Sequence, residues 1–194
     1  FLDYLKKRKT MFQIQYAGGS IAFDVSYYAK AEIEDFQKQL RRAKDFNENW
    51  RWKRLGEKGS GTPVTLPHDA ALFEPRTAAS AGGVNTGWYE GSDYLYTNVF
   101  TPDKTMAGQT AVLEFEGVYH NAEVRLNGEK LAFRPYGYTN FYVDLTGKLR
   151  ANEENTLEVI ARNADQPNSR WYSGAGIYRP VKLWTADQAH IKLN

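Results

Sequence analysis

The sequence contains no cysteine, and this absence removes several kinds of chemistry at once. Without thiols the chain can form no disulfide bond, bind no zinc through thiolates and use no cysteine nucleophile. Histidine is scarce as well, because only His68, His120 and His190 occur and they are widely spaced. No pair of histidines has the spacing of a metal-binding motif. The sequence therefore predicts no dedicated metal site.

Long apolar runs and an excess of one charge are also missing. No run approaches the roughly 20 apolar residues that a membrane-spanning helix needs, so we expect no membrane span. The 25 Lys and Arg residues nearly balance the 23 Asp and Glu residues, which gives a formal net charge of +2. This balance offers little attraction for a polyanion, so we expect no nucleic-acid partner. No phosphate-binding loop, dinucleotide fingerprint or nucleophile elbow is present, and we expect no cofactor.

What the chain does contain is enough apolar material for a folded domain. Of its 194 residues, 42% are hydrophobic and 14% are aromatic. This length suits one full domain with a small appendage. Because the chain opens on Phe1 and not on methionine, we expect it to be trimmed or processed. Nothing in the composition indicates a cellular compartment.

Residues 1–44 predict a hairpin followed by a helix. Two alternating runs, 12–16 and 21–25, flank the sequence AGGS, a pattern typical of a β-hairpin. From Ala29 to Lys44, apolar residues recur at steps of three and four, which predicts an amphipathic helix. The apolar stripe of this helix consists of Ile33, Phe36, Leu40 and Ala43. We expect residues 1–44 to form an extension that packs on a separate domain of residues 45–194.

From Asp45 onward the sequence is typical of an antiparallel β-sandwich, because short alternating runs are separated by turn residues. No further helix is evident. Asn127-Gly128 can supply the positive φ angles of a type I′ hairpin turn. The predicted strands are NWRWKR, DYLYTNVF, TAVLEFEG, AEVRLNG, EKLAFR, NFYVDL, TLEVIAR, RPVKLW and HIKLN.

Alternation along these strands predicts which side chains face the core. The inward set is Leu113, Phe115, Ala122, Val124, Leu126, Leu157, Val159 and Ala161. Three glutamates between these positions, Glu114, Glu116 and Glu158, are expected to face outward.

Two loops, 81–93 and 162–176, combine aromatic side chains with Asn, Asp and Arg. Aromatic faces stack on the C–H faces of sugar rings, while amides, carboxylates and guanidinium groups bind sugar hydroxyls. Core packing is the alternative explanation for most of these aromatics. Carboxylates are plentiful, but their spacing identifies no glycosidase pair, so we assign no catalytic residue.

Several longer motifs occur in order over about Asp45 to Leu183, namely FNENWRWK, VTLPHDA, GWYEG, YTNVFTP, FEGVYHNAEVRLNG, RPYGYTNFYVDLT and NSRWYSGAGIYRPVKL. Together these motifs resemble the N-terminal sugar-binding domain of glycoside hydrolase family 2, and in particular that of bacterial β-galactosidases. The resemblance implies an all-β, antiparallel jelly-roll sandwich of the galactose-binding-domain-like type. Residues 1–44 match nothing at the N-terminus of the family.

The resemblance also implies candidate site residues. In family members this domain lends polar side chains to the wall of the sugar subsite, and the matching positions here are Asn85, Asp93, Asn163 and Asp165. The final motif runs into the last strand near the catalytic barrel, which makes Arg170, Trp171, Tyr172 and Arg179 candidate scaffold or interface residues. For the two arginines, we favour structural pairing over sugar contact. No residue of this chain matches the catalytic glutamates, which lie in a downstream barrel.

The resulting hypothesis is a sugar-binding, non-catalytic N-terminal domain of a β-galactosidase that hydrolyses terminal β-galactosides in carbohydrate metabolism. Its partners would be a β-galactoside-type sugar and the downstream barrel of the same protein. Two alternatives stay open. The chain could be a free-standing carbohydrate-binding module, or a structural buttress that touches no sugar.

Overall fold

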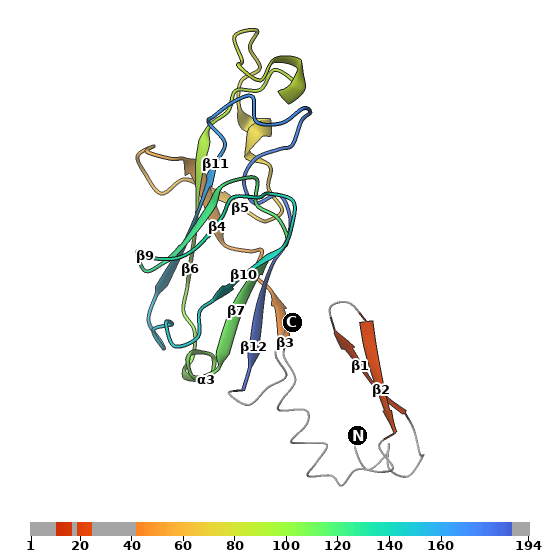
Figure 1. Ribbon diagram of the computed structural model, residues 1–194. Coiled ribbons are helices and arrows are strands. Elements are labelled where there is room, and N and C mark those ends of the chain that lie inside the picture. Colours follow the sequence, from red (N-terminus) through yellow and green to blue (C-terminus); the bar gives the residue numbers. More distant parts are fainter. Residues whose placement is uncertain (1–10, 17–18, 25–41, 188–194) are drawn as a thin grey trace. The chain divides into compact units, whose positions relative to one another are not determined.

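The structure is a computed structural model that describes residues 11–16, 19–24 and 42–187 (Figure 1). The chain divides into two compact units, residues 1–41 with 186–194 and residues 42–185. In the first unit, β1 (Met11–Tyr16) pairs antiparallel with β2 (Gly19–Asp24), which confirms the predicted hairpin.

The helix predicted from Ala29 lies outside the described residues, except for its final turn, where the prediction is wrong. Arg42–Asp45 forms strand β3, which pairs antiparallel with Lys182–Thr185. Pairing with a neighbouring strand supplies hydrogen bonds that outweigh the local helical spacing. The boundary predicted between residues 44 and 45 stays a prediction.

The second unit consists of two sheets. The smaller sheet contains, in spatial order, β10 (Phe141–Asp144), β7 (Thr110–Phe115), β12 (Val181–Ala186) and β3. The larger sheet contains β5 (Thr62–Val64), β4 (Trp50–Arg54), β6 (Asp93–Phe100), β11 (Asn155–Arg162), β8 (Ala122–Leu126) and β9 (Glu129–Arg134). Both sheets are antiparallel, so the predicted all-β class is confirmed.

The strands predicted between residues 49 and 184 are all present, whereas HIKLN lies outside the described residues. Asn127 and Gly128 adopt φ angles of 51° and 84°, as the predicted hairpin turn requires. The expectation of no further helix is wrong, because three short helical elements occur between strands. They are η2 (Ala70–Phe73), η3 (Gly83–Thr86) and α3 (Lys104–Gly108).

The core lies between the two sheets. Leu113 and Phe115 of the smaller sheet share one apolar cluster with Val124, Leu157 and Val159 of the larger sheet, and all five side chains are fully buried. This arrangement confirms the inward face that the alternation predicts. Burying each such side chain stabilises the fold by about 1.5–3 kcal/mol.

Glu114 is predicted to face outward, but its side chain is covered and only 5% exposed. Its carboxylate accepts hydrogen bonds from Trp184 Nε1 at 2.8 Å, Asn140 Nδ2 at 2.9 Å and the Tyr142 hydroxyl at 3.1 Å. Burial alone raises the pKa of this carboxyl, but the hydrogen bonds outweigh burial and lower the pKa overall. Alternation predicts on which face a side chain lies, but not what covers it there.

Strand pairing brings the two candidate loops together. In the antiparallel ladder of β6 and β11, Asp93 at the start of β6 lies opposite Arg162 at the end of β11. Loop 81–93 therefore enters the sheet where loop 162–176 leaves it. Figure 1 shows both loops at the end of this unit that carries η3, away from α3.

Candidate functional site

Asp93 fastens the two loops at the point where they meet. Its Oδ1 accepts a hydrogen bond from the Ala164 backbone N–H at 3.0 Å, and its Oδ2 lies 3.4 Å from Arg162 Nη1. Nearby, a Cβ atom on Gly91 would lie 2.5 Å from both the Asn163 carbonyl oxygen and Gln166 Cγ. Only glycine permits this close approach. The two loops are thus held in fixed register.

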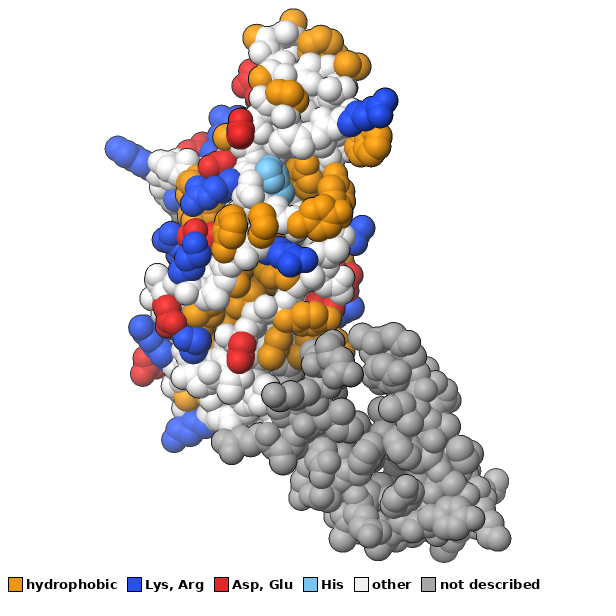
Figure 2. Space-filling view, in the orientation of Figure 1, with side chains coloured by type: hydrophobic (Ala, Val, Ile, Leu, Met, Phe, Trp, Pro, Cys, Tyr) orange, Lys and Arg blue, Asp and Glu red, His pale blue; other side chains and the backbone are white. Residues whose placement is uncertain are grey.

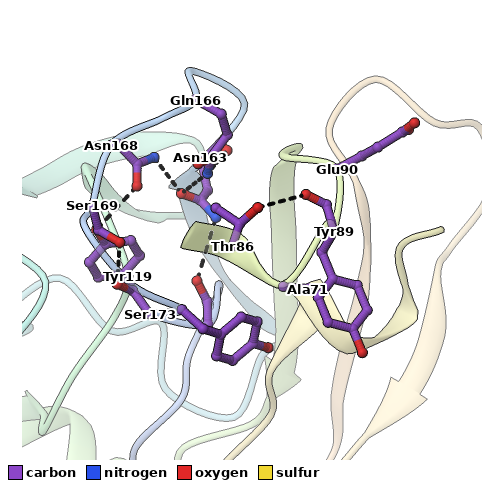
Figure 3. A pocket seen from close by; sticks show the side chains of 12 residues that line it. Ala71, Thr86, Tyr89, Glu90, Tyr119, Asn163, Gln166, Asn168, Ser169 and Ser173 are labelled. Atoms are coloured by element: carbon purple, nitrogen blue, oxygen red, sulfur yellow. Dashed lines mark hydrogen bonds between the residues drawn. The ribbon is translucent and has the colours of Figure 1, made fainter. Parts of the chain in front are cut away.

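A pocket that is partly open to solvent lies between loop 81–93 and loop 162–176 (Figure 3). In Figure 3, the amides of Asn163, Gln166 and Asn168 gather on one side, while Tyr89 and Glu90 lie opposite. The lining residues are Ala71, Thr86, Tyr89, Glu90, Tyr119, Asn163, Gln166, Asn168, Ser169, Tyr172, Ser173 and Gly174.

Asn163 anchors the amide side of the pocket. It is 4% exposed, and its Oδ1 accepts hydrogen bonds from Asn168 Nδ2 at 2.8 Å and from Gln166 Nε2 at 3.0 Å. Both donors come from the same loop, so the loop folds back on itself around one buried amide. Such a bonded network holds its polar groups in place before any ligand arrives.

Asn168 connects this network to the rest of the pocket. Its Nδ2 donates to the Asp165 carbonyl oxygen at 2.8 Å and lies 3.1 Å from His120 Nε2. Its Oδ1 accepts a hydrogen bond from the Tyr119 hydroxyl at 3.2 Å. Burial lowers the pKa of His120, although the charges of Asp93 and Asp165 oppose this effect. Burial thus favours the neutral imidazole beside this amide.

Hydroxyl groups form a second chain along the pocket. The Tyr138 hydroxyl donates to Ser173 Oγ at 2.8 Å, and Ser173 Oγ donates to Ser169 Oγ at 2.9 Å. Ser169 Oγ in turn donates to the Trp171 carbonyl oxygen. The pocket thus presents uncharged donors and acceptors on two sides.

Asp69 joins η2 to the last motif of the chain. Its Oδ1 accepts hydrogen bonds from the backbone N–H groups of Ala71 at 3.1 Å and Ala175 at 2.9 Å. Its Oδ2 accepts a hydrogen bond from the Tyr172 hydroxyl. Burial, followed by Asp69, raises the pKa of Tyr172, so this phenol stays a donor. The hydrogen bond to Asp69 therefore fixes the position of Tyr172 in the pocket wall.

The two glycines of the last motif, Gly174 and Gly176, are required by close contacts. Gly174 has a φ of 71°, and a Cβ atom there would lie 2.8 Å from Asp69 Oδ2. Gly176 has a φ of 87°, and a Cβ atom there would lie 2.0 Å from the Tyr96 hydroxyl oxygen. Both positions combine a left-handed backbone with no space for a side chain. The motif is therefore largely scaffold.

The predicted site residues occupy several different places in the structure. Asn163 and Tyr172 line the pocket, whereas Asp93 lies beneath it as a fastening residue. The guanidinium of Arg179 lies over the Tyr178 ring, 5.3 Å from its centroid. The remaining four residues are exposed and do not line the pocket: Asn85, Asp165, Arg170 and Trp171.

Sequence reasoning missed most of the polar wall, namely Gln166, Asn168, Ser169, Ser173 and Tyr119. A usable signal exists in the density of amides in RNADQPNS, because small amides rarely gather in a loop without bonding to one another.

Charge is sparse at the pocket. Of the described residues that line it, Glu90 is the only acidic one, and its Oε1 accepts a hydrogen bond from Thr77 Oγ1 at 3.0 Å. Among the lining residues none is Lys or Arg. Over the face drawn in Figure 2, charged side chains of both signs are scattered across the described residues. Such a pocket suits a neutral ligand that is rich in hydroxyls.

The described part of the chain lacks two other kinds of feature. No group of three or more His, Cys, Asp or Glu side chains there is placed to hold a metal ion. No helix among those residues is long and apolar enough to cross a membrane.

The paired sheets and the single core define an antiparallel β-sandwich domain. Comparison with protein families assigns it further: residues 74–188 match the model described as the glycosyl hydrolase 2 galactose-binding domain-like domain. The chain belongs to glycoside hydrolase family 2, in which it corresponds to the N-terminal region.

Individual relatives agree with this assignment. The chain is 40% identical over 160 residues to Beta-galactosidase BoGH2A of Bacteroides ovatus, covering 78% of this chain and 19% of that protein. It is 28% identical over 173 residues to a Beta-glucuronidase of Formosa agariphila, covering 77% of this chain and 17% of that protein. A crystal structure of a family 2 glycosyl hydrolase from Bacteroides cellulosilyticus superposes with a TM-score of 0.69 at 30% identity. The match covers 75% of this chain and 21% of that one. The chain thus spans about a fifth of the length of these relatives.

Proposed function

We propose that this chain is the sugar-binding, non-catalytic N-terminal domain of an enzyme that hydrolyses terminal β-galactosides. The observation that carries this proposal is the loop pocket, whose walls are amides and hydroxyls held in place by Asn163 and Asn168. Such groups form hydrogen bonds with sugar hydroxyls and discriminate among their positions. The pocket would form one wall of the subsite for the terminal sugar.

A galactoside fits this wall better than a glucuronide does. A glucuronate ring carries a carboxylate, and its recognition calls for Arg or Lys. None of the residues that line the pocket is a cation, and Glu90 would repel a second carboxylate. The 40% identity to a β-galactosidase supports the same choice.

Catalysis would belong to a downstream barrel. Retaining hydrolysis of glycosides needs two carboxylates roughly 5 Å apart, one as nucleophile and one as acid. The pocket described above is lined by one carboxylate, that of Glu90. We therefore expect the isolated chain to be inactive in a chromogenic β-galactoside assay, while the full-length protein is active.

The test is a comparison of kcat/KM for a β-galactoside in the full-length protein and its variants. Asn168→Ala removes a wall amide and the bonds that position Tyr119 and Asp165, and we expect a loss of about 10-fold to 100-fold, equal to one or two hydrogen bonds. Ser169→Ala removes a single hydroxyl of the wall and should lose less. Lys104→Ala, an exposed change on α3, is the control and should alter kcat/KM less than about 2-fold.

Each alternative function has its own result. If both pocket variants stay folded and keep wild-type kcat/KM, the chain is a buttress that touches no sugar. If the isolated chain binds galactose with micromolar affinity, it acts as a free-standing module, because one wall alone supplies too few contacts for that affinity.

A further inference from the structure

A row of tyrosines extends from the pocket onto the surface. Tyr119 lines the pocket, its ring centroid lies 5.3 Å from that of Tyr138, and the Tyr138 ring lies 5.6 Å from that of Tyr136. Exposure rises along this row, from 5% for Tyr119 to 39% for Tyr138 and 56% for Tyr136. Neighbouring rings meet edge to face, at 60° and 62°, so the row leads from the pocket to one open ring, that of Tyr136.

The loop that carries Tyr136 and Tyr138 is anchored at several points. Arg134 Nη2 donates to Thr139 Oγ1 at 2.7 Å, and the Tyr178 hydroxyl donates to the Gly137 carbonyl oxygen at 2.8 Å. A Cβ atom on Gly137 would lie 2.5 Å from Tyr119 Cδ2, so the loop backbone lies directly against that ring. The Tyr138 hydroxyl is bonded to Ser173 of the pocket wall. Rings held in place in this way lose little conformational freedom when a ligand covers them.

We propose that the open ring of Tyr136, packed edge to face against Tyr138, forms a stacking platform for the second ring of the substrate, on the leaving-group side of the galactoside. This inference rests on the proposed function, which places the first ring against the amide wall. Tyrosine faces match the C–H faces of a pyranose or an aromatic ring, and they contribute no charge. The preferred substrates would therefore be galactosides of at least two rings, such as galactosyl oligosaccharides.

The experiment measures kcat/KM of the full-length protein for two substrates, a β-galactosyl disaccharide and methyl β-galactoside. Only the disaccharide has a ring that can reach the platform. For Tyr136→Ala we expect a loss of about 5-fold to 20-fold with the disaccharide and less than about 2-fold with the methyl glycoside. Tyr136→Phe keeps the aromatic face and should restore the wild-type ratio of the two values.

Phe133→Ala provides a matched control. Phe133 is a similarly exposed aromatic on β9, 51% exposed, and it contacts Lys130 instead of the tyrosine row. Its removal should leave the ratio of the two kcat/KM values unchanged. An equal change of that ratio in both aromatic variants would overturn the platform.

Other outcomes separate this inference from the proposed function. If Tyr136→Ala lowers kcat/KM equally for both substrates, or for neither, the platform is refuted. The proposed pocket wall is not affected by that result. If Tyr136→Ala lowers only the melting temperature of the full-length protein, the row is a domain contact and the inference fails. The wall is judged separately by Asn168→Ala, which should lower kcat/KM for both substrates alike.

Discussion

Two hollows among the described residues differ in size and charge, and the larger one is the poorer candidate for a site. The larger hollow lies beside Trp52 and Phe73 and is lined by Lys53, Arg54, Glu57, Lys58 and Glu74. The loop pocket is smaller and almost uncharged. Size and charge would favour the larger hollow, but Arg54, Glu74 and Lys53 already have partners inside the protein.

The bonds inside the larger hollow make this clear. Arg54 forms a two-pronged ion pair with Glu74, and the Tyr94 hydroxyl donates to Glu74 Oε1 at 3.0 Å. Lys53 Nζ donates to the carbonyl oxygens of Glu57 and Gly59, each at 2.8 Å. A ligand would have to replace these bonds. The loop pocket differs in that its lining groups are uncharged amides and hydroxyls, apart from Glu90, and this difference can be tested.

The largest effect is expected from Glu74→Ala in the larger hollow. Glu74 is 7% exposed, so the change leaves the Tyr94 hydroxyl buried without its acceptor and Arg54 without its partner. Burial raises the pKa of Tyr94, which remains a donor at every working pH. We expect the free energy of unfolding to fall by about 2–4 kcal/mol in a denaturant titration, with kcat/KM per folded molecule unchanged.

The control for this prediction is Lys58→Ala, which changes an exposed residue of the same hollow and should cost less than about 0.5 kcal/mol. A stable Glu74→Ala variant with a lower kcat/KM would contradict the comparison, because it would make the larger hollow part of the working site.

Asp69→Ala should affect both stability and activity, since Asp69 supports the wall of the loop pocket. The change removes the acceptor for two backbone N–H groups and for the Tyr172 hydroxyl. We expect a loss of about 1–3 kcal/mol in the free energy of unfolding, together with a several-fold lower kcat/KM in the full-length protein. Asp69→Asn keeps an acceptor and should lose less of both. If Asp69→Ala lowers stability but leaves kcat/KM unchanged, Tyr172 does not contribute to sugar binding.

Much of the sandwich can be predicted from the sequence, because alternation is a local property. Val124 and Leu157 share the core as their strands predict. The burial of Glu114 depends instead on Asn140, which directly precedes β10, and on Trp184 of β12. No local pattern reports such partners.

The candidate site is less predictable for the same reason. Its two loops meet because β6 pairs with β11, so that Asp93 bonds to Ala164, 71 residues further along the chain. The sequence motifs correctly indicate both loops, but they do not indicate which amides point into the pocket. Asn163 could be predicted, whereas Asn168 became apparent only from its four contacts.

Asn85 sharpens this contrast between motif and geometry. It lies exposed on η3 and does not line the pocket, although the family resemblance makes it a candidate. If the pocket alone forms the wall, Asn85→Ala should change kcat/KM of the full-length protein less than about 2-fold, against at least about 10-fold for Asn168→Ala. A larger loss of kcat/KM for Asn85→Ala than for Asn168→Ala would indicate that η3, and not the pocket, contacts the sugar.

The smallest expected effect is a difference in pH response between the two hollows. His120 borders the loop pocket, while His68 lies near the larger hollow, with its ring stacked on Phe73 and its Nδ1 2.7 Å from the Tyr96 hydroxyl oxygen. Burial lowers the pKa of both imidazoles below the ordinary value of 6.5. Between 6.5 and the lowered value, the unfolded chain binds more protons than the folded protein does. The free energy of unfolding should therefore fall as the pH drops through this window, and stop falling below it.

Replacing one histidine at a time assigns this pH dependence. Gln at position 120 offers an uncharged oxygen to Asn168, so His120→Gln should flatten part of the slope below pH 6.5 while leaving the stability above that pH nearly unchanged. His68→Gln should flatten another part and in addition lower stability at all pH values, because the ring also packs between Trp52 and Phe73. Denaturant titrations from pH 5 to pH 8 measure both. If neither variant changes the slope, the folded protein binds protons at both histidines as readily as the unfolded chain does, and burial in neither hollow controls their protonation.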